Sequence, residues 1–561
     1  MSLKNPADTA REFWKKHRFS IELFGAIYLF GLIVHLYMFT NKFFNYFELG
    51  NIFADMSFTQ GDTIAQGRWF LPIATNLFTS FSMPLVNGLV SLFYIAAAAV
   101  MTIDLLRIRS RLYALLFGFS FAAFPGYACT LAYGVNADAI AMGVFLCALA
   151  VWLYRKWKYG FLPAILLIGC GLGAYQTYLS VSIGMIYMLL FFEAYEEKLE
   201  WKPFVWKAVK AGAMLACGFL VYYGVLQLGT VLAGVSLTDY HGVDSMTSFT
   251  LKGIAKGLVY TYGYFLAYFF SDQYIYTVFR IVCNIAGGVV FFIFVGKRLL
   301  LHKKQKNNVS FLMLLALTAL LPLGVNATPF LMADRVGAGV DRYMIPSIMF
   351  LWAMLMKLMD ISAHPEEAYP EEARAVGTYG KEETRADGTC GKEEDVPCGR
   401  GGSAVLSWIG TVSAAVAVVS SVMICNEAYH RMDAATQVTA SYLNRIAVRL
   451  EEMPEWQQGM PVYFANTKPF MSGTYDVEIP AYDRMTNMPG TEISPHYNER
   501  GIAKYFRTYL HMPIGDAGEE KKERIERTQE FAAMPAYPQE GSIAVIEDVI
   551  VVKLCESEEV Q

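Results

Sequence analysis

The chain is dominated by a series of apolar segments, each about twenty residues long, which short polar stretches separate. An α-helix of that length crosses the hydrocarbon core of a bilayer and satisfies its own backbone hydrogen bonds there. Hydrophobic residues make up 55% of the 561 residues and charged residues 17%, whereas soluble domains carry about 25% charged residues. The sequence therefore predicts a polytopic α-helical membrane protein.

The apolar segments predict about eleven membrane-spanning helices. Their expected limits are residues 21–40, 85–105, 111–128, 138–154, 160–175, 177–194, 209–233, 275–296, 309–327, 342–360 and 404–425. The first segment has the length of a span and exceeds the apolar core of a cleavable signal peptide. We therefore expect it to be the first spanning helix.

Lysine and arginine gather near the N-terminus and after every second predicted span. The five clusters lie at residues 15–18, 107–111, 155–158, 198–210 and 297–306. Because positively charged loops stay on the cytoplasmic side, we expect a multi-pass plasma-membrane protein with a cytoplasmic N-terminus. Segment 257–270 is then predicted to be a non-spanning helix at the membrane surface, since a span there would move the fifth cluster to the outer side.

This topology divides the chain into four parts. We expect a membrane core at 1–360, a cytoplasmic low-complexity linker at 361–403, a last transmembrane helix at 404–425 and an extracytoplasmic domain at 426–561. In that domain, PVYFAN at 461–466 and SIAVIEDVIVVKL at 542–554 have the pattern of strands, the second broken by a turn near Glu547 and Asp548. Helical patterns lie between them, so the sequence predicts a small C-terminal α/β domain.

The charge and the cysteines exclude several other classes of protein. A net charge of −4 gives no electrostatic reason for binding nucleic acid. The nine cysteines form no Cys-x-x-Cys motif and several lie inside apolar segments, so they indicate neither a disulfide framework nor a metal site. Asp239, His241 and Asp244 have no spacing typical of metal ligands. We expect no protein-bound metal and no cofactor, and the need for a divalent cation stays open.

Acidic and basic residues lie together on the predicted outer face, beside the membrane boundary. The first outer loop contains Glu48, Asp55, Asp62 and Arg68. A lipid-linked sugar presents its phosphate at this boundary, because its prenyl chain is confined to the bilayer. Arginine offers a fork of donors that matches phosphate oxygens, and a carboxylate can take the proton of an acceptor hydroxyl while the phosphate leaves. The combination predicts an enzyme that acts on a lipid-linked sugar.

Three islands of sequence resemble the serotype-converting glucosyltransferase family, Gtr type II. They are GDTIAQGRWFLP at 61–72 with PLVNGLVSLFYIAAAAV at 84–100, GLGAYQTYLSVSIG at 171–184, and GSIAVIEDVIVVKL at 541–554. The resemblance implies a GT-C-like architecture and an enzyme that moves a hexose, usually glucose, from a polyprenyl-phosphate donor to a cell-surface polysaccharide. The expected partners are then the lipid bilayer, the polyprenyl-phosphate-linked sugar and a cell-envelope glycan.

One departure from the family concerns the catalytic base. Related sequences often carry Asn-His-Asp early in the first outer loop, where residues 45–48 of this chain read Asn-Tyr-Phe-Glu. Either Glu48 supplies the carboxylate, or Asp55 or Asp62 does, or activity is lost. Asp55 ranks first, because the apolar sequence IFADMSF would raise its pKa and draw it toward the membrane, whereas Asp62 alternatively caps a helix.

Other polar residues near the outer boundary complete the expected site. Arg68 stands beside Trp69 and Phe70 and is either a phosphate ligand or an interfacial anchor. Arg335 and Arg342 each follow an aspartate, so they either bind the donor phosphate or form local salt bridges. Sugar or acceptor binding is expected of Tyr175, Gln176, Asn136 and Asp138. The alternatives are a satisfied hairpin turn for the first two and helix capping for the last two.

The sequence therefore favours an inverting glycosyltransferase at the outer face of the plasma membrane. Three alternatives remain: a transporter or flippase of a lipid-linked sugar, a polysaccharide polymerase, and a non-catalytic envelope-binding protein. Transporters often contain two repeated halves with broken helices, which are not evident in this sequence, and they need no base. His35, inside the first predicted span, is expected to be hydrogen-bonded packing rather than a proton relay.

Overall fold

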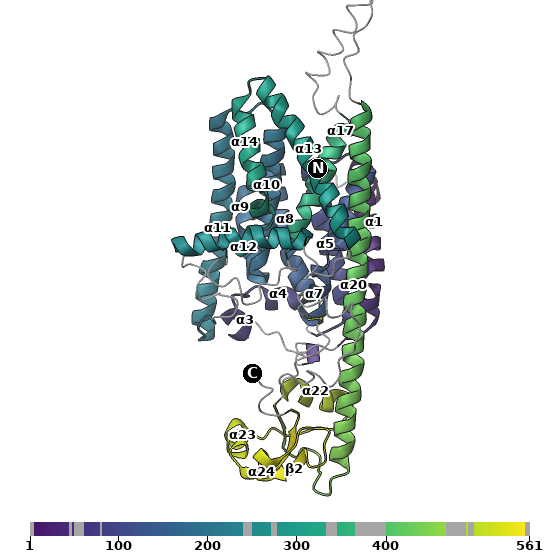
Figure 1. The fold of residues 1–561 in the computed structure, drawn as a ribbon. Helices are drawn as coiled ribbons and strands as arrows, with labels where there is room; N and C mark the ends of the chain where they lie inside the picture. The colour runs from purple at the N-terminus through teal and green to yellow at the C-terminus, as the bar shows by residue number, and fades with distance from the viewer. Residues whose placement is uncertain are drawn as a thin grey trace, which may run out of the picture.

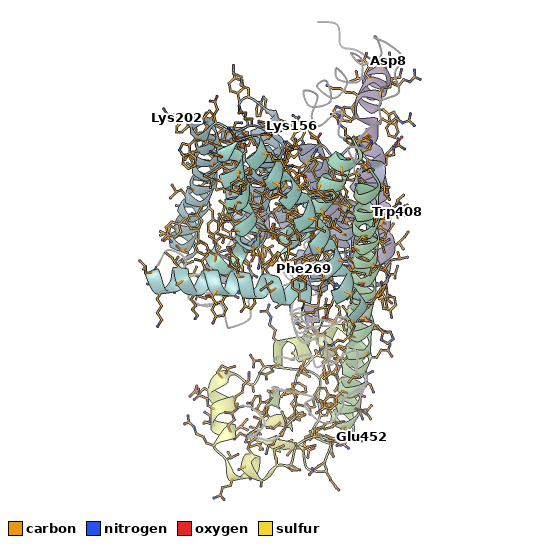
Figure 2. All side chains as sticks on the ribbon, turned by 45° about the horizontal axis from the view of Figure 1, so that its top comes forward. Asp8, Lys156, Lys202, Phe269, Trp408 and Glu452 are labelled. Carbon is orange, nitrogen blue, oxygen red and sulfur yellow. The ribbon has the colours of Figure 1, made fainter. Side chains whose placement is uncertain are left out.

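The computed structural model describes residues 5–43, 48–49, 61–78, 81–238, 250–270, 278–331, 345–364, 400–466, 488, 490–491 and 499–555. Figure 1 shows a bundle of long helices and, beyond one end of it, a small sheet-containing domain, to which one long helix extends. Lys156 and Lys202 lie at the opposite end of the bundle (Figure 2). These ends are termed the domain end and the lysine-rich end.

Helices make up the bundle. Those with at least twelve residues are α1 (Pro6–Thr40), α5 (Pro84–Leu106), α6 (Arg111–Ala122), α8 (Ala137–Lys156), α9 (Phe161–Ala174), α10 (Leu179–Glu196), α11 (Trp201–Ala233), α12 (Leu251–Phe270), α13 (Val278–Lys304), α14 (Asn308–Ala319), α17 (Phe350–Ala363) and α20 (Arg400–Glu451). The shorter ones are α3 (Gly61–Ala65), α4 (Leu71–Thr75), α7 (Gly126–Ala132), η1 (Gly134–Asn136), η2 (Gln176–Tyr178), α15 (Leu321–Val325), α16 (Thr328–Leu331) and η5 (Pro346–Met349).

Eight of the described helices are long and apolar enough to cross a membrane, or nine if α6 and α7 together form one span. The eight helices overlap eight of the predicted spans, and the bent pair covers the one predicted at 111–128. Two further predicted spans correspond to the shorter apolar helices α9 and α14. The 44° bend between α6 and α7 falls at a break containing Pro125, which lacks the N–H that a continuous helix needs. The described residues thus include several helices able to cross a membrane, which is compatible with the predicted polytopic membrane protein.

α12 lies across the bundle instead of along it (Figures 1 and 2). Five of its six buried residues recur at every fourth position, so a narrow stripe of the helix faces the bundle. This stripe consists of Gly253, Gly257, Thr261, Phe265 and Phe269. α12 is not among the described helices that meet the requirements of a span. The arrangement agrees with the non-spanning helix predicted at 257–270, although the helix begins earlier, at Leu251.

Glycines allow the helices at the centre of the bundle to approach one another closely. A Cβ at Gly171 of α9 would lie 2.6 Å from Sγ of Cys147 in α8, and one at Gly88 of α5 would lie 2.2 Å from the ring of Phe39 in α1. Small residues at helix contacts are typical of membrane bundles, where van der Waals packing drives association. These contacts hold together the helices that carry the polar residues discussed below.

α20 is continuous over 52 residues. At about 1.5 Å per residue it is about 78 Å long, more than twice the thickness of the hydrocarbon core, about 30 Å. The span predicted at 404–425 and the helix expected after it therefore form one rod. His35 of α1 is buried against this rod, where its ring bonds to the Tyr429 hydroxyl at 2.5 Å and to the Ala122 carbonyl at 3.0 Å. His35 is thus hydrogen-bonded packing, as expected.

The small domain contains a three-stranded sheet in the order β1-β3-β2. Its elements are β1 (Val462–Ala465), α22 (Glu499–Tyr509), α23 (Glu519–Glu526), α24 (Gln529–Ala533), β2 (Ile543–Ile546) and β3 (Val549–Lys553). β1 pairs with β3 in parallel and β2 pairs with β3 antiparallel. Glu547 and Asp548 join β2 to β3 with positive φ angles of 47° and 62°, which a two-residue hairpin turn requires. Strands are therefore present at both places where the pattern predicts them.

The core of the small domain includes residues from outside it. Leu443 and Ile446 of α20 pack with Phe464 of β1 and Phe506 of α22. Leu49, from the segment between α1 and α3, is fully buried in the same core. The domain is therefore attached to the bundle at two places, through α20 and through the segment that carries Glu48.

Candidate functional site

The predicted site residues that the structure describes lie at the domain end of the bundle. There α3, α4 and α7 lie at the end of the bundle that faces the small domain (Figure 1). The positions outside the described residues are Asp55, Arg335 and Arg342, together with Asp239, His241 and Asp244. The described site residues fall mainly into two groups, one around Glu48 and one around Arg68, which α4 links.

Glu48 is buried, with 3% of its surface exposed, although it belongs to a connecting segment. The amide of Val135 donates a hydrogen bond to Oε1 at 3.0 Å. Gly134 lets the other oxygen approach, because a Cβ there would lie 3.1 Å from Oε2 and 2.8 Å from Oγ of Ser82. The backbone of η1 therefore forms a cradle for this carboxylate, termed the Glu48 cradle (Gly134, Val135 and Ser82).

Burial raises the pKa of Glu48 above its ordinary value. The Ser82 hydroxyl, the Val135 amide and the charge of Lys42 all oppose this rise. Lys42 also contributes to the cradle, since its Nζ donates to the Ser82 carbonyl at 3.4 Å. A carboxylate whose pKa is displaced upward toward neutral pH is suited to accept a proton during a reaction.

Glu48 lies where the bundle meets the small domain. Its neighbour Leu49 packs in the core of that domain. The charge of Glu48 also acts on Tyr509 of α22, whose pKa is raised mainly by burial and further by this carboxylate. One carboxylate is thus in contact with the bundle through η1 and close to the domain through α22.

A second carboxylate is buried where α4, α5 and α8 meet. Asp138 of α8 accepts a hydrogen bond from Nδ2 of Asn87 at 3.1 Å, and its Oδ2 receives none from another side chain of the described residues. Nearby, the Thr75 hydroxyl donates to Oδ1 of Asn136 at 3.2 Å. Asn136 therefore makes no capping bond at the start of α8, so the capping alternative is wrong for this residue. An acid buried in a helix of this kind is a candidate functional residue.

Arg68 lies over the ring of Tyr175, with its guanidinium carbon 4.8 Å from the ring centroid. Such stacking is a favourable cation–π contact. The break between α9 and η2 also holds the loop that carries Arg68, because Nε2 of Gln176 donates to the Gln66 carbonyl at 2.8 Å and to the Tyr222 hydroxyl at 3.2 Å. The side chain of Gln176 therefore forms hydrogen bonds within the protein, in agreement with the alternative of a hydrogen-bonded hairpin turn.

The aromatic neighbours of Arg68 fix the same loop against α9. The Phe70 amide donates to the Gly173 carbonyl at 2.9 Å, and a Cβ at Gly173 would lie 2.6 Å from the ring of Trp69. α4 begins directly after this loop and ends at Thr75, the residue bonded to Asn136. The short segment from Arg68 to Thr75 therefore connects the Arg68 group with Asn136, at the start of α8.

Asp62 has a different environment from Glu48. It lies in the first turn of α3, where an acidic residue interacts favourably with the helix dipole, and its side chain is exposed. Among the described acids of the first connecting segment, Glu48 is the buried one. Nowhere in the described ranges do three or more His, Cys, Asp or Glu side chains form a group that could hold a metal ion.

Three residues of this region were missed by the sequence reasoning: Ser82, Asn87 and Arg280. Arg280 of α13 is 4% exposed and lies over the ring of Tyr268 at the end of α12, 5.8 Å from the centroid. A charge near the start of an apolar segment is a signal that could have identified it, since buried charges in membranes are costly. Ser82 and Asn87 carry no such signal, because their contacts join segments that are distant in the sequence.

Residues 36–354 match the protein family described as glucosyl transferase GtrII. The matched range is more than half of the chain and includes the Glu48 cradle, Arg68, the break at Tyr175 and the buried acid of α8. It ends before α20 and the small domain. No curated protein and no solved structure matches the chain.

Proposed function

We propose, because this chain belongs to the glucosyl transferase GtrII family, that it moves glucose from a polyprenyl-phosphate donor to a cell-surface polysaccharide at the outer face of the plasma membrane. The family and the long apolar helices make the chain a membrane glycosyltransferase, and the donor, the acceptor and the membrane face are the proposed parts. The observation that carries the proposal is a carboxylate, Glu48, buried in a backbone cradle at the junction of bundle and domain.

Glu48 is the proposed catalytic base. Its deprotonated carboxylate accepts the proton of an acceptor hydroxyl while that oxygen bonds to the anomeric carbon of the donor sugar. The bond from this carbon to the phosphate oxygen breaks, and the phosphate leaves with the electron pair. A single displacement inverts the anomeric centre, and general base catalysis contributes about 10²- to 10⁴-fold to the rate. Asp55 and Asp62 stay the alternative bases.

Arg68 is the proposed ligand of the donor phosphate. Stacking on Tyr175 orients the guanidinium plane, and the N–H groups at the edge of that plane match phosphate oxygens. Asn136 and Asp138, on the segment that α4 contacts, are the proposed partners of sugar hydroxyls. Arg335 and Arg342 are further proposed phosphate ligands.

The lysine-rich end faces the cytoplasm in this proposal. Basic residues gather at that end, at the ends of α8 and α13 and the start of α11, and the positive-inside rule assigns such loops to the cytoplasm. The N-terminus is then cytoplasmic and the small domain is outside. The candidate site at the domain end would meet a lipid-linked donor at the outer boundary, as expected of a GT-C-like enzyme.

The small domain is the proposed support for the acceptor. It lies beyond the end of the bundle (Figure 1) and shares its core with Leu49, next to the proposed base. A polysaccharide held by this domain would therefore be held close to Glu48. A transporter of lipid-linked sugars would need neither this domain contact nor a buried base, which makes transfer the better-supported function.

Sugar transfer by the purified protein tests the proposal. With polyprenyl-phosphate glucose and envelope glycan supplied, Glu48→Gln should lower turnover by about 10²- to 10⁴-fold and still bind the donor. Glu452→Gln removes an exposed carboxylate just beyond α20 and is the matched control, whose turnover should not change. Full turnover in Glu48→Gln would exclude Glu48 as the base. Failure of the unaltered protein with a panel of lipid-linked sugars would favour the transporter alternative.

A further inference from the structure

A polar pocket lies at the lysine-rich end, away from the candidate site. Its volume is about 390 Å³, and it is lined by the ends of α5, α8 and α10 with parts of α11 and α17. One wall is apolar and includes Leu105, Leu106, Ile186, Leu189, Leu190 and Phe192. Leu189 and Leu190 are partly exposed, so this wall is accessible from outside the protein.

The other wall is charged. Five cationic side chains of the described residues line it: Arg107, Arg155, Lys156, Lys207 and Lys357. The three lysines form ion pairs, namely Lys156 with Asp104 at 3.0 Å, Lys207 with Glu193 at 2.5 Å and Lys357 with Glu196 at 3.5 Å. The two arginines form no ion pair with any described residue. Glu197 is the remaining carboxylate of the lining, so the pocket and its ion pairs keep one positive charge in excess.

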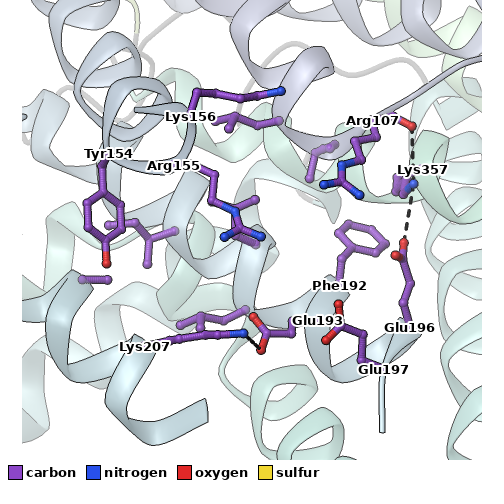
Figure 3. Close-up of a pocket in the computed structure, with 16 residues that line it drawn as sticks. Arg107, Tyr154, Arg155, Lys156, Phe192, Glu193, Glu196, Glu197, Lys207 and Lys357 are labelled. Carbon is purple, nitrogen blue, oxygen red and sulfur yellow. Dashed lines mark hydrogen bonds and ion pairs between the residues drawn. The ribbon is translucent and has the colours of Figure 1, made fainter. Parts of the chain in front are cut away.

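Arg107 occupies an unusual position for an arginine. It ends α5 in the left-handed conformation, with φ 52° and ψ 47°, a position that favours glycine. Its carbonyl accepts a hydrogen bond from Nζ of Lys357 at 3.4 Å, which ties this turn to α17. Figure 3 shows the guanidinium groups of Arg107 and Arg155 over the pocket, between Lys156 on one side and the Lys207–Glu193 pair on the other.

We infer that this pocket binds the phosphodiester headgroup of an anionic membrane lipid. A phosphodiester carries one negative charge, which balances the excess positive charge, and its oxygens match the donors of two guanidinium groups. An acyl chain of the same lipid would lie along the leucine-rich wall. Basic pockets between helices at the membrane boundary are suited to anionic headgroups.

A neighbouring cavity extends the same surface. It has a volume of about 340 Å³ and shares Arg107 and Lys156 with the first pocket. Its other walls include Phe19, Leu23 and Val100 of α1 and α5, so it offers a second apolar slot beside the same cations. A soluble phosphate would use the guanidinium groups but gain nothing from either apolar wall, and we therefore assign the pocket to a lipid.

Lipid retention by the whole purified protein tests this inference. Native mass spectrometry would count bound lipids after exposure to vesicles of phosphatidylglycerol or of zwitterionic phosphatidylcholine. We expect selective retention of phosphatidylglycerol, and a loss of its affinity by about a hundredfold in the double variant Arg107→Gln/Arg155→Gln, because two charge-assisted hydrogen-bonding groups are removed. The double variant Lys158→Gln/Lys202→Gln removes two exposed charges of the same end that line neither cavity and should change affinity by less than about threefold.

Each outcome decides the inference. Equal losses in the two double variants would overturn it, because a diffuse positive surface would then explain retention. Displacement of the lipid by an equal concentration of glycerol phosphate would also overturn it, since the ligand would then be a soluble phosphate. Glucosyl transfer measured on the same samples reports whether the variants fold, since neither arginine belongs to the candidate site. If Arg107→Gln misfolds, Arg155→Gln alone, with an expected loss of about tenfold, provides the same comparison.

Discussion

Gly134→Ala perturbs the Glu48 cradle with the smallest possible change. The added methyl carbon would lie 2.8 Å from Oγ of Ser82 and 3.1 Å from Oε2 of Glu48. Carbon and oxygen atoms in close contact are normally at least about 3.3 Å apart. The hydroxyl must therefore move by about 0.5 Å and the carboxylate oxygen by about 0.2 Å, while the charge and the chemical groups of the site stay the same.

The change should affect both the stability of the protein and its catalysis. Both crowded atoms are at the ends of rotatable side chains, so the cost to folding should be near the low end of the range for overpacking, about 1 kcal/mol. A displacement of about 1 Å in a catalytic group costs about 10²-fold in rate. The carboxylate's shift of about 0.2 Å should therefore lower turnover by roughly two- to threefold.

Turnover at saturating donor, with the melting temperature measured on the same sample, separates the two effects. Gly287→Ala in α13 is the matched control, because its methyl carbon would lie 3.2 Å from the ring of Trp352 in α17 and touches no residue of the cradle. It should change the melting temperature alone. If a well-folded Gly134→Ala variant turns over as fast as the unaltered protein, the reasoning that the position of Glu48 controls the rate is refuted.

Four further predictions concern the base, the domain and the topology. Because burial raises the pKa of Glu48, turnover should fall as the pH drops, with a midpoint above the ordinary value of about 4.3, and Asp62→Asn should leave this midpoint unchanged. Because its pKa is raised in the folded state, Glu48 contributes stability below its unfolded pKa, and this contribution is lost as the pH rises through its folded pKa. The melting temperature of Glu48→Gln should therefore exceed that of the unaltered protein at neutral pH but not at pH 4. Leu49→Ala should destabilise the small domain by about 2–5 kcal/mol in limited proteolysis, whereas Val545→Ala, 37% exposed, should have little effect. On intact cells an impermeant thiol reagent should label a cysteine at 244 and not one at 304, and the reverse pattern would contradict the proposed topology.

The helices of the membrane part were largely predictable because their cause is local. A run of twenty apolar residues forms a helix long enough to cross the bilayer, whatever the rest of the chain contains. Each predicted span has an apolar helix at or near its position. The charge distribution also predicted that the aromatic segment at 257–270 does not span, and α12 lies across the bundle (Figure 1). Its composition agrees, because α12 is long enough to span but is not among the described helices that are also apolar enough.

Lengths and ends of helices were less predictable, because they depend on packing. The break between the spans predicted at 160–175 and 177–194 is confirmed, since α9 ends at Ala174 and Tyr175 has an extended backbone before η2. By contrast, α20 continues past the predicted span at 404–425 and reaches Glu451, because its last turns bury apolar residues in the core of the small domain. The length of α20 does not follow from residues within the predicted span.

The candidate site was the least predictable part, since its contacts join distant segments. Glu48 and Val135, whose amide bonds to the carboxylate, are 87 positions apart, and in sequence this glutamate looks like any acid of a polar loop. Asn136 looks like a helix cap, but it bonds to Thr75 of α4 instead. Chemical type indicated which residues to consider, and only tertiary packing distinguishes the buried Glu48 from the exposed Asp62.

The adjacency of Glu48 and Leu49 has a mechanical consequence. The carboxylate is held by the bundle through η1, and the next residue is held by the core of the small domain. Because consecutive Cα atoms are about 3.8 Å apart, the domain cannot move far from the bundle without pulling the carboxylate out of its cradle. A base positioned this way would be in place only while the domain is docked. In the proposed reaction, docking of the domain that supports the acceptor would therefore also place the group that removes the acceptor's proton.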